Sequence, residues 1–238
     1  MTMFIKQQIQ GVTMKKFTET GMQINMGTVN CSECSTDMNF KLERPSVLLH
    51  SCCGPCSTAV IERLLSDYNI TVFFYNPNIT EKEEYELRLD AQRTVVGRFN
   101  GGSMFIIDRI GLIEGTYRPD SFLCSVRGLE DEPEGGERCS VCFRLRLEET
   151  ARRAKAGGYD FFATTLTVSP HKNYTLISQI GKEIADDYGI GFLDMDFKKK
   201  AGFQRSIELS KKFGLYRQNY CGCRFSRWFD KPDSEDKL

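Results

Sequence analysis

The stretch SVLLHSCCGPCSTAVIERLL (residues 46–65) decides the fold. Its first part, SVLLH, has the length and composition of a buried strand, and STAVIERLLSDY (57–68) has the apolar spacing that predicts a helix. The loop between them contains Cys52, Cys53 and Cys56. Ligands of open α/β sheets bind at the carboxyl ends of the strands, so these thiols are predicted to lie on the chemically active rim.

The alternation of strand and helix patterns continues after this stretch. Strands are expected in ITVFFYN (70–76), MFIID (104–108), YDFFATT (159–165) and around GFLDMDF (191–197), and helices in 81–99, near 143–156, about 173–188 and about 202–213. This order predicts an α/β fold with a mostly parallel, Rossmann-like sheet and helices on both faces. Residues 109–138 break the pattern with the acidic run GLEDEPEGGE, and they are predicted to be an irregular connection with a functional or mobile role.

The length and composition predict one main domain with appendages. The chain has 238 residues, of which 40% are apolar and 27% charged, as in soluble globular proteins. Residues 1–44 are expected to form an N-terminal extension containing Cys31 and Cys34, residues 45–230 the catalytic α/β domain, and residues 231–238 a polar tail. No apolar run approaches the roughly 20 residues of a membrane span, and no secretory signal pattern is present. A cytoplasmic protein without a membrane partner is expected.

The formal net charge of zero conceals an uneven distribution. Residues 139–229 contain 16 Lys and Arg against 9 Asp and Glu, so the C-terminal half is basic and suits a polyanion. Cations alternate with aromatic residues near the C-x-C at 221, a pattern typical of phosphate binding and base stacking. The candidate nucleic-acid residues are Arg217, Tyr220, Arg224, Arg227 and Lys198. Each of these runs is also compatible with an ordinary solvated surface.

Nine of the ten cysteines lie in four short clusters: Cys31 and Cys34; Cys52, Cys53 and Cys56; Cys139 and Cys142; Cys221 and Cys223. In a protein that is neither small nor secreted, clustered thiols are more often metal ligands than disulfides. A cubane 4Fe-4S cluster or a tetrahedral zinc ion takes four ligands. Seven cysteines in the core therefore favour a cluster with a second metal, or a cluster with free redox thiols, over one zinc-ribbon-like site with spare cysteines. The Cys31 and Cys34 pair is compatible with an accessory metal or with two surface thiols.

Six blocks along the chain resemble a known family. In order they are HSCCGPCSTAVIERL, FFYNPNIT followed by KEEYELR, CSVCFRLRLEETARRA, FFATTLTVSPHKN, DFKK and YRQNYCGCRFS, and they span roughly residues 46–228. These blocks resemble those of the QueH-type epoxyqueuosine reductases. The resemblance implies a HUP-like fold, a 4Fe-4S cluster with a nearby second metal, and cobalamin-independent removal of the epoxide oxygen of epoxyqueuosine in the tRNA anticodon loop.

The resemblance also implies ligands and partners. The expected cluster ligands are Cys52, Cys139, Cys142 and Cys221, and the expected ligands of the second metal ion, predicted to be iron, are Cys53, Cys56 and Cys223. Some family members have an aspartate at the position of Cys56, which leaves open whether this thiol binds the second metal, the cluster or neither. The implied partners are a tRNA with a GUN anticodon and an electron donor that the sequence does not identify.

Reduction of an epoxide to an alkene needs two electrons, an acid on the oxygen, and loss of that oxygen as water. An iron–sulfur cluster carries single electrons, and an open metal site can polarise the C–O bond. The candidate proton donors in rim loops are Lys172, Tyr75 and Asp196. Each has an ordinary alternative: Lys172 can bind phosphate, Tyr75 can end a strand in the core, and Asp196 can cap a helix.

Two other classes of protein remain possible at the level of sequence. One is an electron-transfer or disulfide-reductase module with a CCG-type iron–sulfur site. Cys52, Cys53 and Gly54 match its Cys-Cys-Gly sequence over these three residues. The other is a zinc-stabilised nucleic-acid-binding protein without catalysis. An ATP pyrophosphatase is disfavoured because its SGGxDS phosphate loop does not occur.

Overall fold

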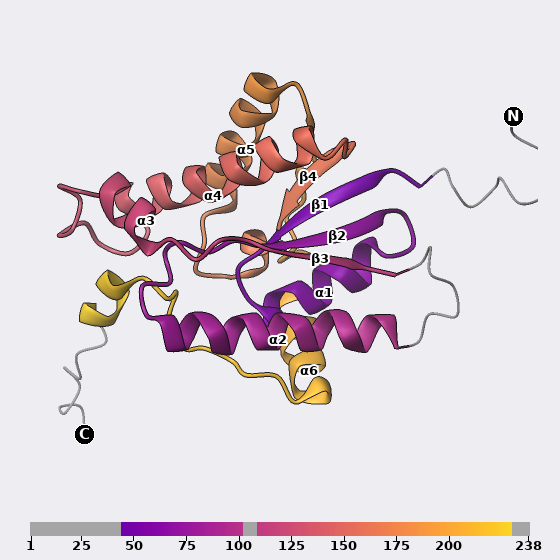
Figure 1. The fold of residues 1–238 in the computed structure, drawn as a ribbon. Helices are drawn as coiled ribbons and strands as arrows, with labels where there is room; N and C mark the ends of the chain where they lie inside the picture. Colours follow the sequence, from indigo (N-terminus) through magenta and orange to yellow (C-terminus); the bar gives the residue numbers. More distant parts are fainter. Residues whose placement is uncertain (1–43, 102–108, 230–238) are drawn as a thin grey trace, which may run out of the picture. The chain divides into compact units, whose positions relative to one another are not determined.

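The computed structural model describes residues 44–101 and 109–229, and within them five strands form one sheet (Figure 1). The strand order is β3-β2-β1-β4-β5, and every pairing is parallel. The strands are β1 (Ser46–Ser51), β2 (Asn69–Phe74), β3 (Gly111–Glu114), β4 (Phe161–Thr164) and β5 (Gly191–Phe192). The order and the parallel pairing confirm the predicted α/β, Rossmann-like fold.

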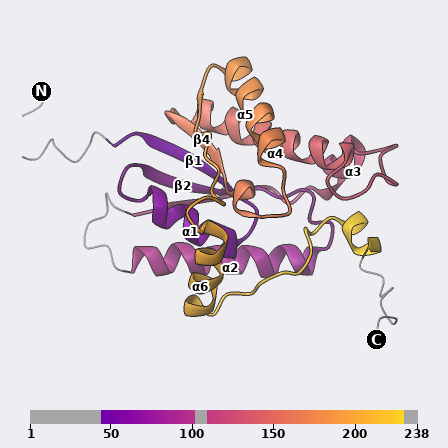
Figure 2. The same ribbon diagram turned by 180° about the vertical axis from the view of Figure 1, so that it is seen from behind.

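Helices cover both faces of the sheet (Figures 1 and 2). One face carries α1 (Gly54–Leu64), α2 (Lys82–Asn100) and α6 (Gly202–Phe213), and the other carries α4 (Glu137–Ala156) and α5 (Tyr174–Tyr188). Shorter elements are the helix α3 (Pro119–Ser125) and the 3-10 segments η2 (Thr165–Val168) and η3 (Arg224–Phe229). None of the described helices is long and apolar enough to cross a membrane.

The alternation of side chains along β1 builds a core on each face. Val47 and Leu49 pack with apolar residues of α1 and α2, whereas Leu48 between them packs with α4 and α5. All three side chains are fully buried. A strand that is buried on both faces is apolar throughout rather than alternating, which is why SVLLH is recognisable in the sequence.

Local chemistry fixes the ends of the helices. Asn173 begins α5 by accepting a hydrogen bond from the backbone N–H of Leu176 on its side-chain oxygen, as an N-cap does. Gly189 ends the same helix in the left-handed region, with a φ of 59°. Both boundaries agree with the helix predicted for about 173–188.

The observed secondary structure differs from the prediction in several details, and one predicted strand lies outside the described residues. MFIID falls outside the described residues, and β3 instead occurs within the stretch predicted to be irregular, as does α3. β3 is short and lies at an edge of the sheet, so its sequence pattern is weak. The α4 helix begins at Glu137 and not near Phe143, and only Gly191–Phe192 of GFLDMDF is strand. Beyond the strand, the Asp194 carboxylate accepts hydrogen bonds from the Tyr174 and Ser178 hydroxyls.

The point where the chain reverses its direction across the sheet lies between β1 and β4. From β1 the chain builds outward through β2 and β3, and it then returns to add β4 and β5 on the other side of β1. The loops after β1 and β4 consequently diverge at their carboxyl ends, and such switch points are where open α/β sheets bind ligands.

Candidate metal centre

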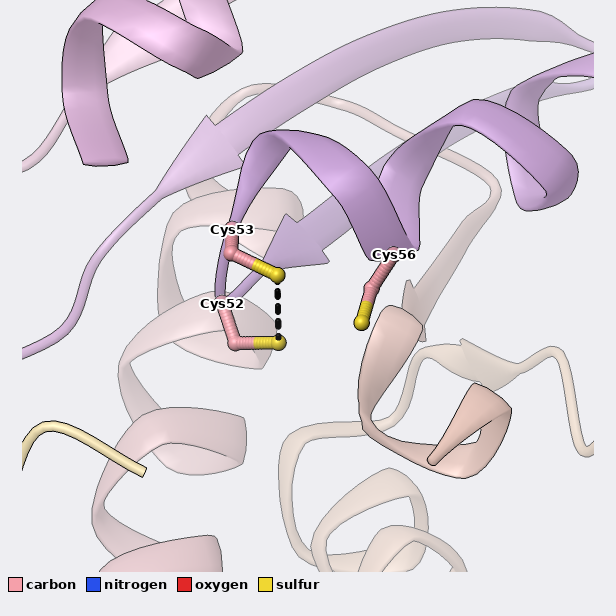
Figure 3. A group of neighbouring side chains, drawn as sticks. All are labelled: Cys52, Cys53 and Cys56. Carbon is pink, nitrogen blue, oxygen red and sulfur yellow. Dashed lines mark hydrogen bonds between the residues drawn. The ribbon is translucent and has the colours of Figure 1, made fainter. Parts of the chain in front are cut away.

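Three cysteine sulfurs meet at the carboxyl end of β1. Cys52 follows the strand, Cys53 is the N-cap of α1, and Cys56 lies in the first turn of that helix. Their Sγ atoms all lie within 4.8 Å of one another, and Sγ of Cys52 is 3.9 Å from that of Cys53 (Figure 3). We call these residues the cysteine trio. The placement confirms that the CCGPC loop converges on one point.

Close packing of α1 on α2 holds the trio in place. A Cβ atom on Gly54 would lie 2.7 Å from both the carbonyl carbon and the oxygen of Ala91, so only glycine allows this approach. On the other side, the Thr165 hydroxyl accepts a hydrogen bond from the Cys52 N–H at 3.3 Å and lies 3.6 Å from its Sγ. The loop after β4 thus fixes the position of Cys52.

The three thiols of the trio differ in pKa. Hydrogen bonding from Cys53 and Cys56 holds the pKa of Cys52 well below its usual value, so Cys52 is the favoured thiolate. The hydrogen bond to Cys52 in turn raises the pKa of Cys53 to about 12, and the pKa of Cys56 is raised for the same reason. One thiolate supported by two thiols is a group of donors that a metal ion can deprotonate and bind.

A second group of four cysteines lines one small pocket. Cys139 and Cys142 lie in the first two turns of α4, and Cys221 and Cys223 lie in the loop before η3. We call these four residues the cysteine quartet. Hydrogen bonding from Cys223 lowers the pKa of Cys221 well below its usual value, whereas burial raises the pKa of Cys142. The start of a helix favours negative charge, which suits thiolates at the N-termini of both α1 and α4.

A buried arginine on α2 holds the C-x-C segment beside the sheet. Arg88 forms an ion pair with Glu84 at 2.6 Å and donates hydrogen bonds to the carbonyl oxygens of Tyr220 and Cys221, both at 3.1 Å. The Asn78 amide also donates to the Cys221 carbonyl at 3.1 Å. The blocks NPN and KEEYELR, whose role the sequence did not reveal, therefore position the C-x-C.

Gly222 makes this docking possible. Its φ is +95°, a backbone conformation that residues with side chains rarely adopt. A Cβ there would also lie 2.8 Å from the side chain of Ile79 and 3.2 Å from the guanidinium carbon of Arg88. The glycine of the C-x-C is thus required both by its dihedral angle and by its neighbours.

Lys172 is the one candidate proton donor that lines the pocket of the quartet. It lies in the loop between η2 and α5, and its Nζ is 5.8 Å from the centre of the Phe143 ring. Its positive charge contributes to the low pKa of Cys52 as well as to that of Cys221. Lys172 is therefore the residue that acts on the trio and the quartet together.

The structure places the other two candidates elsewhere. The Tyr75 ring stacks on Phe73 with 5.5 Å between ring centres, and burial raises its pKa. The Asp196 carboxylate accepts a hydrogen bond from the N–H of Lys198 at 3.1 Å, which caps the turn before α6. Neither residue lines the pocket of the quartet.

The pocket also contains residues that the sequence did not single out. Glu134, in the acidic run that was predicted to be an irregular connection, lines it, and burial raises the pKa of its carboxyl group. Arg138 donates hydrogen bonds to the carbonyl oxygens of Leu129 and Glu130, at 3.0 and 2.8 Å, and thereby folds this run over the start of α4. No sequence pattern distinguishes such contacts to carbonyl groups from ordinary surface arginines.

The nucleic-acid candidates are dispersed around this region. Arg224 is exposed and lies over the Phe225 ring, and Arg88 lies over the ring of Tyr220. Arg217 donates to the Ser210 hydroxyl at 3.2 Å, while Lys198 donates to the Lys172 carbonyl at 3.0 Å. The side chain of Arg227 lies outside the described residues. Their role in binding tRNA stays a prediction.

The two groups of cysteines fit metals of different kinds. Three sulfurs bound to one tetrahedral ion at about 2.3 Å lie roughly 3.8 Å apart, close to the 3.9 Å between Cys52 and Cys53. The quartet supplies the four thiolates that a cubane takes. The eight described cysteines are free thiols, so all seven of these donors are available. The fold and the site together define a protein of the Rossmann-like α/β class with cysteine thiols grouped as candidate metal ligands.

Comparison with known proteins specifies the family. The model of epoxyqueuosine reductase QueH matches residues 47–228, and the chain belongs to this family. Epoxyqueuosine reductase QueH of Streptococcus pyogenes serotype M1 is 44% identical over 183 residues, covering 77% of this chain and 71% of the relative. The protein of the same name from Thermotoga maritima is 37% identical over 184 residues, covering 76% of this chain and 90% of the relative. The resemblance drawn from the six sequence blocks is confirmed.

Proposed function

We propose that this chain reduces epoxyqueuosine to queuosine in tRNA. The observation that carries the proposal is the grouping of seven cysteines: the trio after β1, whose sulfurs lie within 4.8 Å of one another, and the quartet, which lines one pocket. The family to which the chain belongs is named for this activity. An electron-transfer module or a zinc-stabilised binding protein would account for the thiols but not for that family membership.

The trio and the quartet divide the metals between them in this proposal. The quartet holds the 4Fe-4S cluster, and the trio holds a second metal ion, which we take to be iron. This grouping assigns Cys52 to the second metal and Cys223 to the cluster, the reverse of the division that the sequence resemblance implies. The support for it is geometric, because the sulfurs of Cys52, Cys53 and Cys56 are mutually close and the other four line one pocket.

The division is tested by comparing iron and acid-labile sulfide in two variants. Cys52→Ser should retain the sulfide of the parent and lose iron in excess of it, whereas Cys142→Ser should lose both. Cys124→Ser, which changes an exposed thiol on α3, should retain both. Loss of sulfide in Cys52→Ser would favour the division implied by the sequence.

The chemistry requires two electrons and two protons for each epoxide oxygen that leaves as water. When bound, the metal centre supplies the electrons singly and a Lewis acid for the oxygen. Lys172, which lines the pocket of the quartet, is our candidate to give a proton from Nζ to the departing oxygen. Its carbonyl accepts a hydrogen bond from Lys198, which ties the loop of Lys172 to the turn after β5.

Substrate binding relies on the basic side of the site. We propose that Arg217, Tyr220, Arg224 and Arg227 contact the phosphates and bases of a tRNA with a GUN anticodon, and that a separate protein or small molecule donates the electrons. The wobble base of an anticodon is already single-stranded, so extruding it costs at most a few kcal/mol. A cytoplasmic location would give the enzyme both its tRNA and the reduced thiols that the metals need.

An anaerobic assay tests the function directly. Reconstituted protein is incubated with epoxyqueuosine-containing tRNA and a chemical reductant, and the nucleosides are then separated by mass. Queuosine should form in proportion to the iron and sulfide content of the same sample. Absence of queuosine in a fully loaded sample would contradict the proposed function, and its formation by protein that contains zinc and no sulfide would contradict the proposed cluster.

A further inference from the structure

Arg146 lies in the wall of the pocket that the quartet lines. It follows Cys142 by one turn of α4, and its side chain points back along the helix, donating from Nε to the Cys142 carbonyl at 3.1 Å. Only 3% of the residue is exposed. A guanidinium group cannot lose its proton in a protein, so α4 places a permanent positive charge beside the cysteines.

This charge lacks the partner that a buried arginine normally has. Among residues 44–101 and 109–229, no carboxylate forms an ion pair with Arg146, and its remaining contact is with the Phe143 ring at 5.7 Å. Arg88 provides a comparison within the same chain, because it is equally buried and is paired with Glu84 at 2.6 Å. A buried ion without a counter-charge is strongly unfavourable.

Four thiols line the pocket together with Arg146: Cys139, Cys142, Cys221 and Cys223. Lys172 and Arg138 line the same pocket and increase its positive charge, and Glu134 is the one acidic residue among its lining residues. The pocket is therefore built to receive negative charge.

We propose that Arg146 is the buried counter-charge of the iron–sulfur cluster and that it raises the reduction potential of the cluster. The inference rests on the proposed function, since it assumes that the quartet binds a cluster. A cubane with four thiolate ligands is an anion, and reduction makes it more negative. A fixed cation in a medium of low dielectric constant stabilises the reduced form more than the oxidised form, and hydrogen bonding and local charge are known to set such potentials.

The experiment compares the midpoint potential of the cluster in the parent and in three variants, by anaerobic redox titration. Arg146→Met removes the charge while keeping much of the volume, and it should shift the potential to a more negative value. Arg146→Lys keeps the charge and should shift it less. Arg152→Met is the matched control, because Arg152 is an exposed arginine of the same helix that is paired with Glu149. The cluster of this variant should have the midpoint potential of the parent.

Each outcome decides the proposal. An unchanged potential in a fully loaded Arg146→Met protein would overturn it. If Arg146→Met binds less iron than the parent, the iron and sulfide content of Arg146→Lys is decisive. Content equal to that of the parent supports a role for the charge. A loss equal to that of Arg146→Met overturns the proposal, because packing alone would then explain the effect. A parent protein that contains no sulfide would contradict the proposed function itself, before any variant is compared.

Discussion

Lys172 shows how much a single residue depends on its surroundings. Many lysines of this chain extend into solvent, whereas Lys172 is half-buried in the pocket that the quartet lines. The sequence placed it in a rim loop with two possible roles, proton donor and phosphate ligand. The pocket contains the four thiols of the quartet as well as the cations Arg138 and Arg146, and we assign Lys172 the first role because it lines the pocket together with the proposed cluster ligands.

Replacing Lys172 by Met is expected to lower kcat by about a hundredfold or more, the usual contribution of a positioned acid. The affinity for tRNA should change little, since the residue acts on the reacting oxygen. Single-turnover rates and tRNA dissociation constants, measured on the same preparation, check both expectations. A phosphate ligand would give the opposite result, with weaker binding at an unchanged rate. The charge-matched control is Lys199→Met, on the exposed part of the neighbouring turn.

Residues that act through contacts to backbone carbonyls were beyond prediction from the sequence. The cysteines were found because their spacing is specific to metal binding. Arg88, Arg138 and Arg146 were not found, because no sequence pattern separates an arginine that donates to carbonyl oxygens from an arginine on the surface. Only the fold brings α2 beside the C-x-C and so gives Arg88 its role.

At the scale of elements, the crossing of α1 and α2 holds the trio. Gly54→Ala should disturb this crossing, because the new methyl group would meet the Ala91 backbone at 2.7 Å. We expect a destabilisation of about 1–3 kcal/mol, as overpacking usually causes, together with weaker binding of the second metal. Thermal unfolding and metal analysis of the anaerobic protein measure the two effects.

The control for this change is Gly97→Ala, an exposed position in α2 where a Cβ has nothing within 4 Å. Alanine there should stabilise the helix by about 0.5–1 kcal/mol. If both glycines give the same result, the close approach of α1 to α2 is not what requires Gly54.

An ion pair joins α2 to the edge strand β3, and its contribution should depend on pH. Arg93 donates two hydrogen bonds to Glu114, both at 2.7 Å, and they lower the pKa of the Glu114 carboxyl group. A lowered pKa means that the stabilisation is present above the pKa of an unfolded glutamate, about 4.3, and disappears as the pH falls through the folded value. The pair is exposed, so we expect about 0.2–1 kcal/mol.

The measurement is the melting temperature of Glu114→Gln and of the parent at several values of pH. The variant should be less stable at pH 7, and the difference should vanish in acid. A difference that persists when the pH is well below the folded pKa of Glu114 would show that packing, and not charge, links Glu114 to Arg93.

The elements found from the sequence and those missed differ in a physical way. β1, β2 and the long helices have enough apolar residues in a regular pattern to be recognised locally. β3 and β5 are short strands at the two edges of the sheet, and pairing with a neighbour defines them more than their own composition does. The proposed division of the cysteines between two metals likewise rests on the fold, because it depends on which loops the strand order brings together.

At the scale of the whole molecule, the basic C-terminal half should make tRNA binding sensitive to salt. Affinity is expected to fall as salt rises, with a slope set by the number of phosphates neutralised. Replacing Arg224 and Arg227 together by Ala should reduce the slope by about 2 and weaken binding, while leaving the absorbance of the cluster unchanged. Binding curves at several salt concentrations measure both quantities.

Lys211 and Lys212 near the end of α6 supply a matched double variant, since changing both to Ala removes the same charge from exposed positions. A slope that falls equally in both double variants would indicate a general effect of net charge. An unchanged slope in the Arg224 and Arg227 variant would place the tRNA surface elsewhere on the protein.

The docking of the C-x-C onto Arg88 has a consequence for how the enzyme is made. A ribosome releases Cys139 and Cys142 long before Cys221 and Cys223, although all four line one pocket. A nascent chain that stops short of Cys221 can form most of the sheet and still lack half of the quartet. Under the proposed function, capture of the cluster waits until synthesis has passed Cys223, so a truncated translation product would withdraw no iron–sulfur clusters from the cell's supply.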